Sequence, residues 1–299
     1  MSSPETLPQQ PDYSYEAFAQ RDFYIALNER LLKYSPEIHS LVDFATGTGA
    51  VIDHLRSHGK LKEPFTAIGV DIDEEGLERA RRKFTNLNTL ESGSNYVNFI
   101  NYSVAETPIT SSSQELVTYL HAIHLMPDPL ATLVEAERIL EPRGTILVIT
   151  GYTKDFAYPP RTEARRQWGL LAKIARDSLK SRAEEIEYVL KQKGEDEKAN
   201  DLFARGRDPF QNTASDYLDL LAQAGFQYSV PDNHITNMDR DDMRAICSYR
   251  EFAQGRFPNI PLEYSIPALV EAVDPAFERM ETDYFQRGWY LYRAKKKAA

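Results

Sequence analysis

The chain has 299 residues, of which 42% are hydrophobic and 27% are charged, and its formal net charge is −10. This apolar content favours one large folded unit with an insertion over two independent domains. The acidic balance argues against a broad nucleic-acid surface, because phosphate contacts need clustered Lys and Arg.

Cysteine usage and hydropathy narrow the classes further. Cys247 is the single cysteine, which excludes an internal disulfide and a multi-cysteine zinc site, so we expect no metal. No apolar run reaches the roughly 18 residues of a membrane span, and no charged-then-apolar signal pattern opens the chain. We therefore expect a cytoplasmic monomer or homodimer with no membrane and no nucleic-acid partner.

The first part of the chain divides into a tail and a helical segment. Residues 1–12 are polar and proline-rich, which predicts a flexible tail. Apolar side chains from Tyr13 to Tyr34 fall mostly at helical intervals, so one or two helices should precede the first strand. Tyr15 and Tyr24 suit either core packing or a ligand contact, and the pattern leaves both open.

Residues 40–55, SLVDFATGTGAVIDHL, combine a strand, a glycine turn and the start of a helix. The segment from Leu41 to Ala45 suits a buried strand. Gly47 and Gly49 allow a ligand to approach the bare backbone, and the N–H groups of the helix that follows face the turn. The pattern predicts a nucleotide-binding loop.

The next strand, Phe65 to Val70, ends at an acidic residue that supports this prediction. Asp71 follows Gly47 by 24 residues, about the spacing at which an acid after the second strand contacts ribose hydroxyls. Asp73 is the rival candidate, although its position favours capping the helix that follows.

Three more strands are predicted at residues 96–102, 115–120 and 145–149. They complete a core that spans residues 13–151. Ligands collect at the carboxyl ends of strands in an open α/β sheet, so the residues after each strand are the candidates for binding.

Residues 152–212 change to long helical periodicity and form an inserted segment. Ser181 and Glu184 give an S-x-x-E capping-box pattern, which predicts two helices. The first part is basic, with Arg161, Arg165 and Arg166, and the second part is acidic. Solvated helix faces account for most of this charge pattern, and the functional alternative is a lid that recognises an anionic or polar acceptor.

The core resumes in residues 213–299. Thr213 and Asp216 form a second capping-box pattern before an amphipathic helix that Gly225 ends. A strand at 226–230, helices between 238 and 280 interrupted at three prolines, and a final strand at 288–294 complete the prediction. The segment RAICSYREFAQGRFPNIP is a candidate wall of the acceptor pocket.

VDFATGTG followed by GVDID resembles motif I and the following acid of class I S-adenosylmethionine-dependent methyltransferases. Farther along, SVAETPI resembles the family's loop after strand three, QELVTYLHAIHLMPDP its strand four, and EAERILEPRGTILVI the approach to strand five. The resemblance covers roughly residues 13–152. Ala45 replaces the usual first glycine, a variant similar to quinone-biosynthesis methyltransferases, and the layout is similar to trans-aconitate methyltransferase-like enzymes of the small-molecule type.

This resemblance implies an α/β fold: a Rossmann-like seven-stranded methyltransferase sheet with helical lid insertions, its last strand antiparallel beside the fifth. It implies S-adenosyl-L-methionine as the cofactor. Val104 stands where the family usually has an adenine-binding acid. The implied cofactor contacts are Asp43, Ala45, Thr46, Gly47, Gly49, Asp71, Ile72, Val104, Ala105, Glu106 and Leu120.

The acceptor side is less specific. His124 matches a position that is often His in small-molecule members of the family, where it would act as a general base, orient the acceptor or pack in the core. The helices before strand one close over the methyl donor in the family. Candidate acceptor contacts are Tyr15, Tyr24, His121, Arg161, Arg165 and Arg166.

The implied reaction is attack of a nucleophile on the donor's methyl group, most simply O-methylation of a small carboxylic acid, phenol or other secondary metabolite. The donor is already activated, so neither a catalytic triad nor a metal is required. One alternative is a repurposed protein that binds the donor without methylating. Another is an NAD-dependent oxidoreductase, but its third fingerprint glycine would fall at Ile52.

Overall fold

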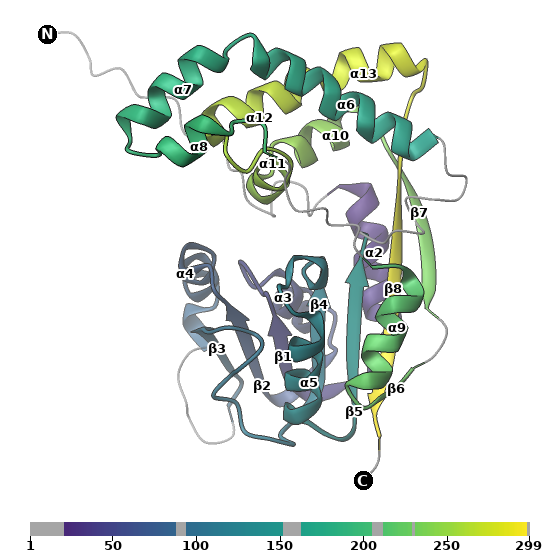
Figure 1. The fold of residues 1–299 in the computed structure, drawn as a ribbon. Coiled ribbons are helices and arrows are strands. Elements are labelled where there is room, and N and C mark those ends of the chain that lie inside the picture. Colours follow the sequence, from purple (N-terminus) through teal and green to yellow (C-terminus); the bar gives the residue numbers. More distant parts are fainter. Residues whose placement is uncertain (1–20, 88–93, 152–162, 205–211, 229–230, 298–299) are drawn as a thin grey trace, which may run out of the picture.

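Five parallel strands form the larger part of the sheet, and the apolar runs of the inner strands are buried on both faces. The computed structural model describes residues 21–87, 94–151, 163–204, 212–228 and 231–297 (Figure 1). The strand order is β3-β2-β1-β4-β5-β8-β6, with β7 also paired to β8. The strands are β1 (Ile38–Phe44), β2 (Leu61–Asp71), β3 (Tyr96–Asn101), β4 (Gln114–Leu120), β5 (Leu140–Thr150), β6 (Phe226–Tyr228), β7 (Asp232–Met238) and β8 (Phe285–Lys296).

The described residues therefore confirm the Rossmann-like sheet and the antiparallel pairing of the last strand with β5. They contain eight strands, however, and not seven. The additional strand is β7, which pairs antiparallel with the first half of β8. Its sequence, DNHITNM, is mostly polar and partly exposed, so it lacks the apolar alternation that predicts a strand. Pairing with β8 imposes its extended conformation.

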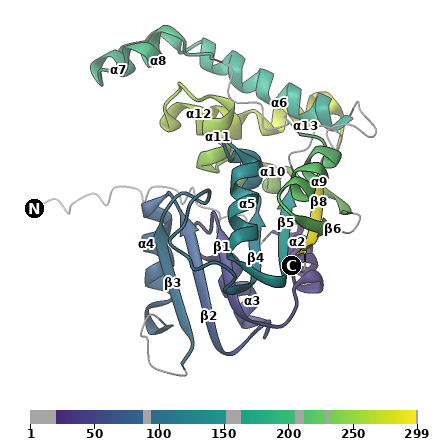
Figure 2. The same cartoon turned by 60° about the horizontal axis from the view of Figure 1, so that its bottom comes forward.

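Helices cover both faces of this sheet (Figures 1 and 2). Buried residues of α2 (Asp22–Tyr34), α3 (Ala50–Ser57) and α4 (Glu74–Lys83) belong to one hydrophobic cluster, and those of α5 (Pro129–Ile139) and α9 (Ala214–Gln223) belong to the other. Two short 3-10 turns, η1 (Thr85–Leu87) and η2 (Ile123–Leu125), follow α4 and β4.

Seven more helices form what we call the helical cap, which lies over the carboxyl ends of the parallel strands (Figures 1 and 2). They are α6 (Glu163–Lys180), α7 (Ala183–Gln192), α8 (Asp196–Asn200), α10 (Arg240–Cys247), α11 (Arg250–Arg256), α12 (Leu262–Glu271) and α13 (Val273–Met280). Helix α6 packs against α12 and α13. The inserted segment thus shares one hydrophobic cluster with helices from the carboxyl-terminal part of the chain.

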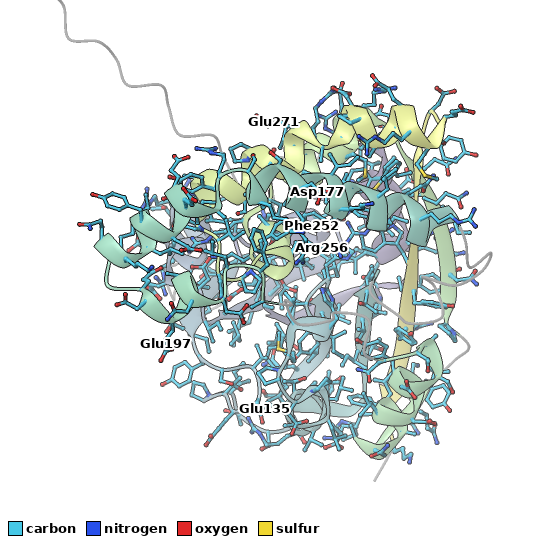
Figure 3. The ribbon with its side chains drawn as sticks, turned by 45° about the horizontal axis from the view of Figure 1, so that its top comes forward. Glu135, Asp177, Glu197, Phe252, Arg256 and Glu271 are labelled. Atoms are coloured by element: carbon cyan, nitrogen blue, oxygen red, sulfur yellow. The ribbon has the colours of Figure 1, made fainter. Side chains whose placement is uncertain are left out.

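Aromatic contacts inside the cap show how the two segments are joined. The ring of Trp168 on α6 lies 5.7 Å from that of Phe252 on α11. Figure 3 labels Phe252 and Arg256 on α11, together with Asp177 on α6 and Glu271 on α12. Leu171 and Leu179 on α6 are each 1% exposed, as the predicted apolar stripe requires.

Of the two capping boxes predicted from the sequence, one is present in the structure and the other is not. Thr213 and Asp216 form the predicted capping box of α9. The predicted capping box at Ser181 is wrong, because Arg182 is the N-cap of α7 without a side-chain bond, and Ser181 Oγ donates to the carbonyl of Ser178. Serine at that position caps the end of α6 and not the start of α7.

The helix breaks predicted at three prolines are also only partly present. Pro258 and Pro261 lie between α11 and α12, as expected. Pro267 is inside α12, so the predicted break there is wrong. Its neighbours Ile266 and Leu269 are 3% and 0% exposed, and their burial offsets the roughly 3 kcal/mol that an interior proline costs a helix.

No helix among the described residues is both long enough and apolar enough to span a membrane.

Candidate functional site

The loop after β1 has the backbone conformation of a ligand-binding turn. Ala45, Gly47 and Gly49 all have positive φ angles, of 54°, 51° and 75°. A Cβ on Gly49 would lie 3.0 Å from the rings of Phe84 and Phe99, whereas one on Gly47 would meet nothing within 4 Å. Gly49 is therefore required for packing, and Gly47 leaves its backbone open to a ligand.

Asp71 at the end of β2 holds this loop in place. Its Oδ2 accepts a hydrogen bond from the Gly47 backbone N–H at 2.8 Å, and its Oδ1 accepts one from the Asp73 N–H at 3.0 Å. A carboxylate accepts about four hydrogen bonds, so Asp71 retains capacity for two hydroxyl groups of a ligand. Asp73 instead caps α4 by accepting from Glu75 N–H, as the sequence predicts.

Asp43 stabilises the same loop from the buried side. It is 1% exposed, and it accepts hydrogen bonds from Thr46 Oγ1 at 2.7 Å and from Thr118 Oγ1 at 2.6 Å. Burial raises the pKa of Asp43 to about 7, the two threonine bonds oppose that rise, and the charge of Asp71 adds to it. The carboxylate therefore joins β1 to β4 within the protein interior.

Exposed apolar side chains lie beside Asp71. Ile72 is 77% exposed and Tyr102 is 49% exposed, and Tyr102 N–H donates to the Asp71 carbonyl at 3.1 Å. Large apolar groups left in water at the ends of β2 and β3 suit a planar ring of a ligand. Val104 is only 6% exposed and packs in the core, so its side chain turns away from this surface.

The loop that carries Val104 is held to α5 by an ion pair whose carboxylate is buried and whose arginine is partly exposed. Glu135 is 7% exposed, and its Oε1 accepts from Thr107 N–H at 2.8 Å and Thr107 Oγ1 at 2.6 Å. Arg138 donates to both oxygens of Glu135, at 2.7 Å each, and also to the Ile109 carbonyl at 2.9 Å. Burial opposes ionisation of Glu135, but the bonds from Arg138 and Thr107 outweigh it and lower its pKa.

Two histidines follow β4 on the other side of the loop. His121 N–H donates to the Ile149 carbonyl at 2.7 Å, and its ring lies 4.9 Å from Tyr24 and 4.6 Å from Trp289. His124 is 8% exposed, and its Nδ1 lies 3.4 Å from Thr150 Oγ1. Both residues lie beside the carboxyl-terminal end of β5, at the edge of the sheet that the helical cap covers (Figure 1).

The order of these groups follows the order of the strands. Tyr102 follows β3, Asp71 ends β2, the glycine loop follows β1, and His121 follows β4. Neighbouring strands are about 4.8 Å apart, so these groups form a row along one edge of the sheet. The row suits an elongated ligand with a planar base at one end, a ribose over Asp71 and a reactive group near β4.

The family comparison matches the same segment. Residues 42–148 fit the family model described as a methyltransferase domain. That range contains the glycine loop, Asp71, the loop fastened by Glu135, and both histidines. This segment is therefore a methyltransferase domain of the class I S-adenosylmethionine-dependent type. The resemblance seen in the sequence is thus confirmed for residues 42–148.

Curated relatives match less than half of this chain. The ubiquinone/menaquinone biosynthesis C-methyltransferase UbiE of Rickettsia massiliae (strain Mtu5) is 28% identical over 138 residues, which is 43% of this chain and 53% of that protein. The corresponding protein of Rickettsia prowazekii (strain Madrid E) is 30% identical over 129 residues, 40% of this chain and 50% of that protein. The chain thus spans about half the length of the curated relatives it matches.

Solved structures share the fold at low identity. The YcgJ protein of Bacillus subtilis has a TM-score of 0.53 and 16% identity, with 92% of this chain and 100% of that chain covered. The [4+2]-cyclase SpnF has a TM-score of 0.52 and 14% identity, with 92% and 81% covered.

The cofactor of this family, S-adenosyl-L-methionine, fits the site. Gly47 offers open backbone and Asp71 has spare acceptor capacity, as described above. Thr48 Oγ1 is buried in the same loop and has no hydrogen-bond partner within the described residues. A buried hydroxyl without a partner is rare in proteins and suits a polar ligand group. No group of three His, Cys, Asp or Glu among the described residues is arranged to hold a metal.

The predicted cofactor residues share this edge, although their individual contacts remain predictions. Asp71, Gly47 and Ile72 lie at its surface, while Asp43 and Val104 lie beneath it. Of the predicted acceptor residues, Tyr24 and His121 contact each other. Arg166 is exposed in the first turn of α6. Tyr15, Arg161 and the Arg165 side chain lie outside the described residues.

The sequence interpretation missed Thr48, Tyr102 and Glu135. The E-x-x-R spacing of Glu135 and Arg138 is the local signal for an ion pair across one helical turn. The bonds from Glu135 and Arg138 to residues 107–109 join parts of the chain that are far apart in sequence, so no local pattern predicts them. The sequence predicts Tyr102 only as the last residue of a strand.

We predict that Asp43→Asn removes a stability loss that the wild type suffers as pH rises. The folded protein holds the Asp43 proton up to about pH 7, whereas an unfolded aspartate releases it near pH 4, so the wild type loses stability between these values. The variant should gain on the wild type by up to about 4 kcal/mol across that window. Urea unfolding at several pH values measures this difference, and parallel pH curves would contradict it.

We predict that Glu135→Gln weakens binding of the adenine end of the cofactor. Loss of the charged bonds frees the loop at Thr107, so the dissociation constant of S-adenosylhomocysteine should rise about 5- to 30-fold, roughly 1–2 kcal/mol. Binding of S-ribosylhomocysteine, which lacks adenine, should change little. Calorimetry with both ligands makes the comparison.

Glu137→Gln is the matched control, because Glu137 is on the same helix but pairs with Lys296 on the opposite side from the loop. An equal loss for both ligands in Glu135→Gln, or an equal loss in the control, would mean that the ion pair serves only general stability.

Proposed function

We propose that the protein transfers a methyl group from S-adenosyl-L-methionine to a small organic acceptor held between the ends of β4 and β5 and the helical cap. The observation that carries this proposal is the bond from the Gly47 N–H to Asp71, made within a matched methyltransferase domain. It fixes the open loop and the ribose-binding acid in one arrangement. The cytoplasm is the proposed compartment, and the proposed partner is the acceptor alone.

The residues of this chain contribute mainly position and exclusion of water. The bound cofactor supplies an activated methyl group. Asp71 and the glycine loop would orient it, and the cap would keep water from the transfer. His124 is the proposed proton acceptor where the nucleophile carries a proton, because it is next to Thr150 at the acceptor side of the sheet.

O-methylation is the proposed form of the reaction, because an oxygen nucleophile with a nearby imidazole needs no further catalytic group. C-methylation is the second candidate, because the curated relatives are named C-methyltransferases. Their similarity covers 40–43% of this chain, and the family model ends at residue 148. Acceptor choice in this protein therefore depends on the cap, which is outside the matched family domain.

A protein of this fold that does not methylate is the other alternative. SpnF shares the fold and is named a [4+2]-cyclase, and fold similarity alone does not define activity. Detection of a product 14 mass units heavier than its acceptor, together with release of S-adenosylhomocysteine, would support methyl transfer. Binding of the cofactor without either product would support the alternative.

We predict that S-adenosylhomocysteine binds and raises the melting temperature, because a ligand that binds only the folded state stabilises it. Asp71→Ala should weaken this binding by roughly 1–3 kcal/mol, since it removes a charged acceptor. Asp73→Ala is the control, because Asp73 caps α4 without contacting the loop in the described hydrogen bonds. Wild-type protein that shows no thermal shift at saturating ligand would refute the proposed function.

We predict that His124→Ala slows turnover roughly 10²–10⁴-fold while the affinity for S-adenosylhomocysteine is retained, the range for a positioned proton acceptor. Thr150→Val should cause a smaller loss, because it removes only the neighbour of Nδ1. Single-turnover rates and melting temperatures of both variants test this role. A large fall in melting temperature with normal turnover would assign His124 to the core instead.

A further inference from the structure

His121 shows two independent features that core packing does not explain. Its φ angle is 57°, in the left-handed region that side chains rarely adopt. Both ring nitrogens are buried, and neither has a hydrogen-bond partner within the described residues. Buried polar atoms are nearly always hydrogen-bonded, so an imidazole with two unpaired nitrogens is costly unless a ligand or water completes it.

Two aromatic rings fix where these nitrogens lie. Tyr24 from α2 and Trp289 from β8 are 3% and 1% exposed, and both meet the imidazole edge-on at interplanar angles of 68°. Trp289 is anchored in turn, since its Nε1 donates to Thr236 Oγ1 at 3.0 Å. The imidazole is therefore held between apolar walls. A molecule that reaches its nitrogens must displace neighbouring side chains and must itself be largely apolar.

The charges around His121 further limit which chemical group of a ligand could bind to its imidazole. Burial, and then the charges of Arg287 and His124, lower its pKa well below the ordinary value, so the ring is neutral at pH 7. A neutral imidazole offers one donor and one acceptor nitrogen. Arg287 lies 4.3 Å from the ring centroid of Trp289, and its positive charge favours an oxygen that carries partial negative charge.

We propose that His121 binds the phenolic hydroxyl of an aromatic methyl acceptor, whose ring packs against Tyr24 and Trp289. This inference rests on the proposed function and names its substrate class. His121 directly follows β4, the neighbour of the strand that carries the glycine loop. A hydroxyl bound there lies beside the donor and next to His124.

The test uses 2-naphthol and its methyl ether, 2-methoxynaphthalene, as probes. In the ether a methyl group replaces the hydroxyl hydrogen, so the ether cannot donate the hydrogen bond that His121 would accept from 2-naphthol. Calorimetry on the wild-type protein saturated with S-adenosylhomocysteine should show 2-naphthol binding about tenfold more tightly than the ether, the worth of one such bond. His121→Leu should abolish this preference.

His121→Asn is the matched variant, because asparagine tolerates positive φ and still offers an acceptor and a donor. It should retain part of the preference. S-adenosylhomocysteine affinity and melting temperature of both variants check the fold. A kinetic measurement complements the binding data. In His121→Leu, turnover of 2-naphthol with S-adenosyl-L-methionine should fall mainly because KM rises.

The outcomes separate this inference from the proposed function. Wild-type protein that does not bind S-adenosylhomocysteine refutes the proposed function itself. Protein that binds it but shows no preference for 2-naphthol, or keeps the full preference in His121→Leu, refutes only the role of His121. In that case the two ring nitrogens are satisfied by water alone.

Discussion

The carboxylate of Asp71 is the constraint on which the rest of the donor site depends. It accepts from the Gly47 N–H after β1 and from the Asp73 N–H after β2, so one side chain pairs backbone groups that have left the strand ladder. β1 and β2 are parallel and in register up to that point, with Asp43 opposite Gly69. The Thr46 N–H still donates to the Val70 carbonyl of β2 at 3.1 Å. The loop then turns through Gly47, which has a positive φ angle, and there the Asp71 carboxylate takes over from the backbone carbonyls.

A second carboxylate, that of Asp43, supports the same loop from the other side. The negative charges of Asp43 and Asp71 repel each other. Asp43 links the loop residue Thr46 to Thr118 of β4, whereas Asp71 links it to β2. The loop is thus held by both neighbouring strands. This arrangement buries the carboxyl group of Asp43, and both the burial and the charge of Asp71 disfavour its ionisation. A site that binds a cationic sulfonium tolerates such excess negative charge, because the ligand compensates it when bound.

Local chemistry predicted the parts of the molecule that local chemistry controls. Apolar runs located the five parallel strands, and the aspartate before Glu74 and the threonine before Ala214 were predicted as helix caps because their side chains act within three residues. The sequence interpretation failed where distant partners decide. β7 is a strand only because β8 lies beside it, Pro267 is tolerated only because α12 is buried, and Glu135 matters through bonds to residues 28 positions away.

The cap and the acceptor wall are joined through one strand. Gln167 of α6 donates to the Tyr284 carbonyl at 3.1 Å and accepts from the Gln286 N–H at 3.1 Å, so it substitutes for a neighbouring strand at the start of β8. Trp168 adds a bond to the Gln286 carbonyl at 3.2 Å. Arg287 and Trp289 follow immediately on β8, beside His121. Helix α6 is therefore bonded to the start of the strand that carries Arg287 and Trp289. If the acceptor binds at His121 as proposed, the inserted segment contributes to its binding site without a direct contact, because it holds the start of the strand that carries Trp289.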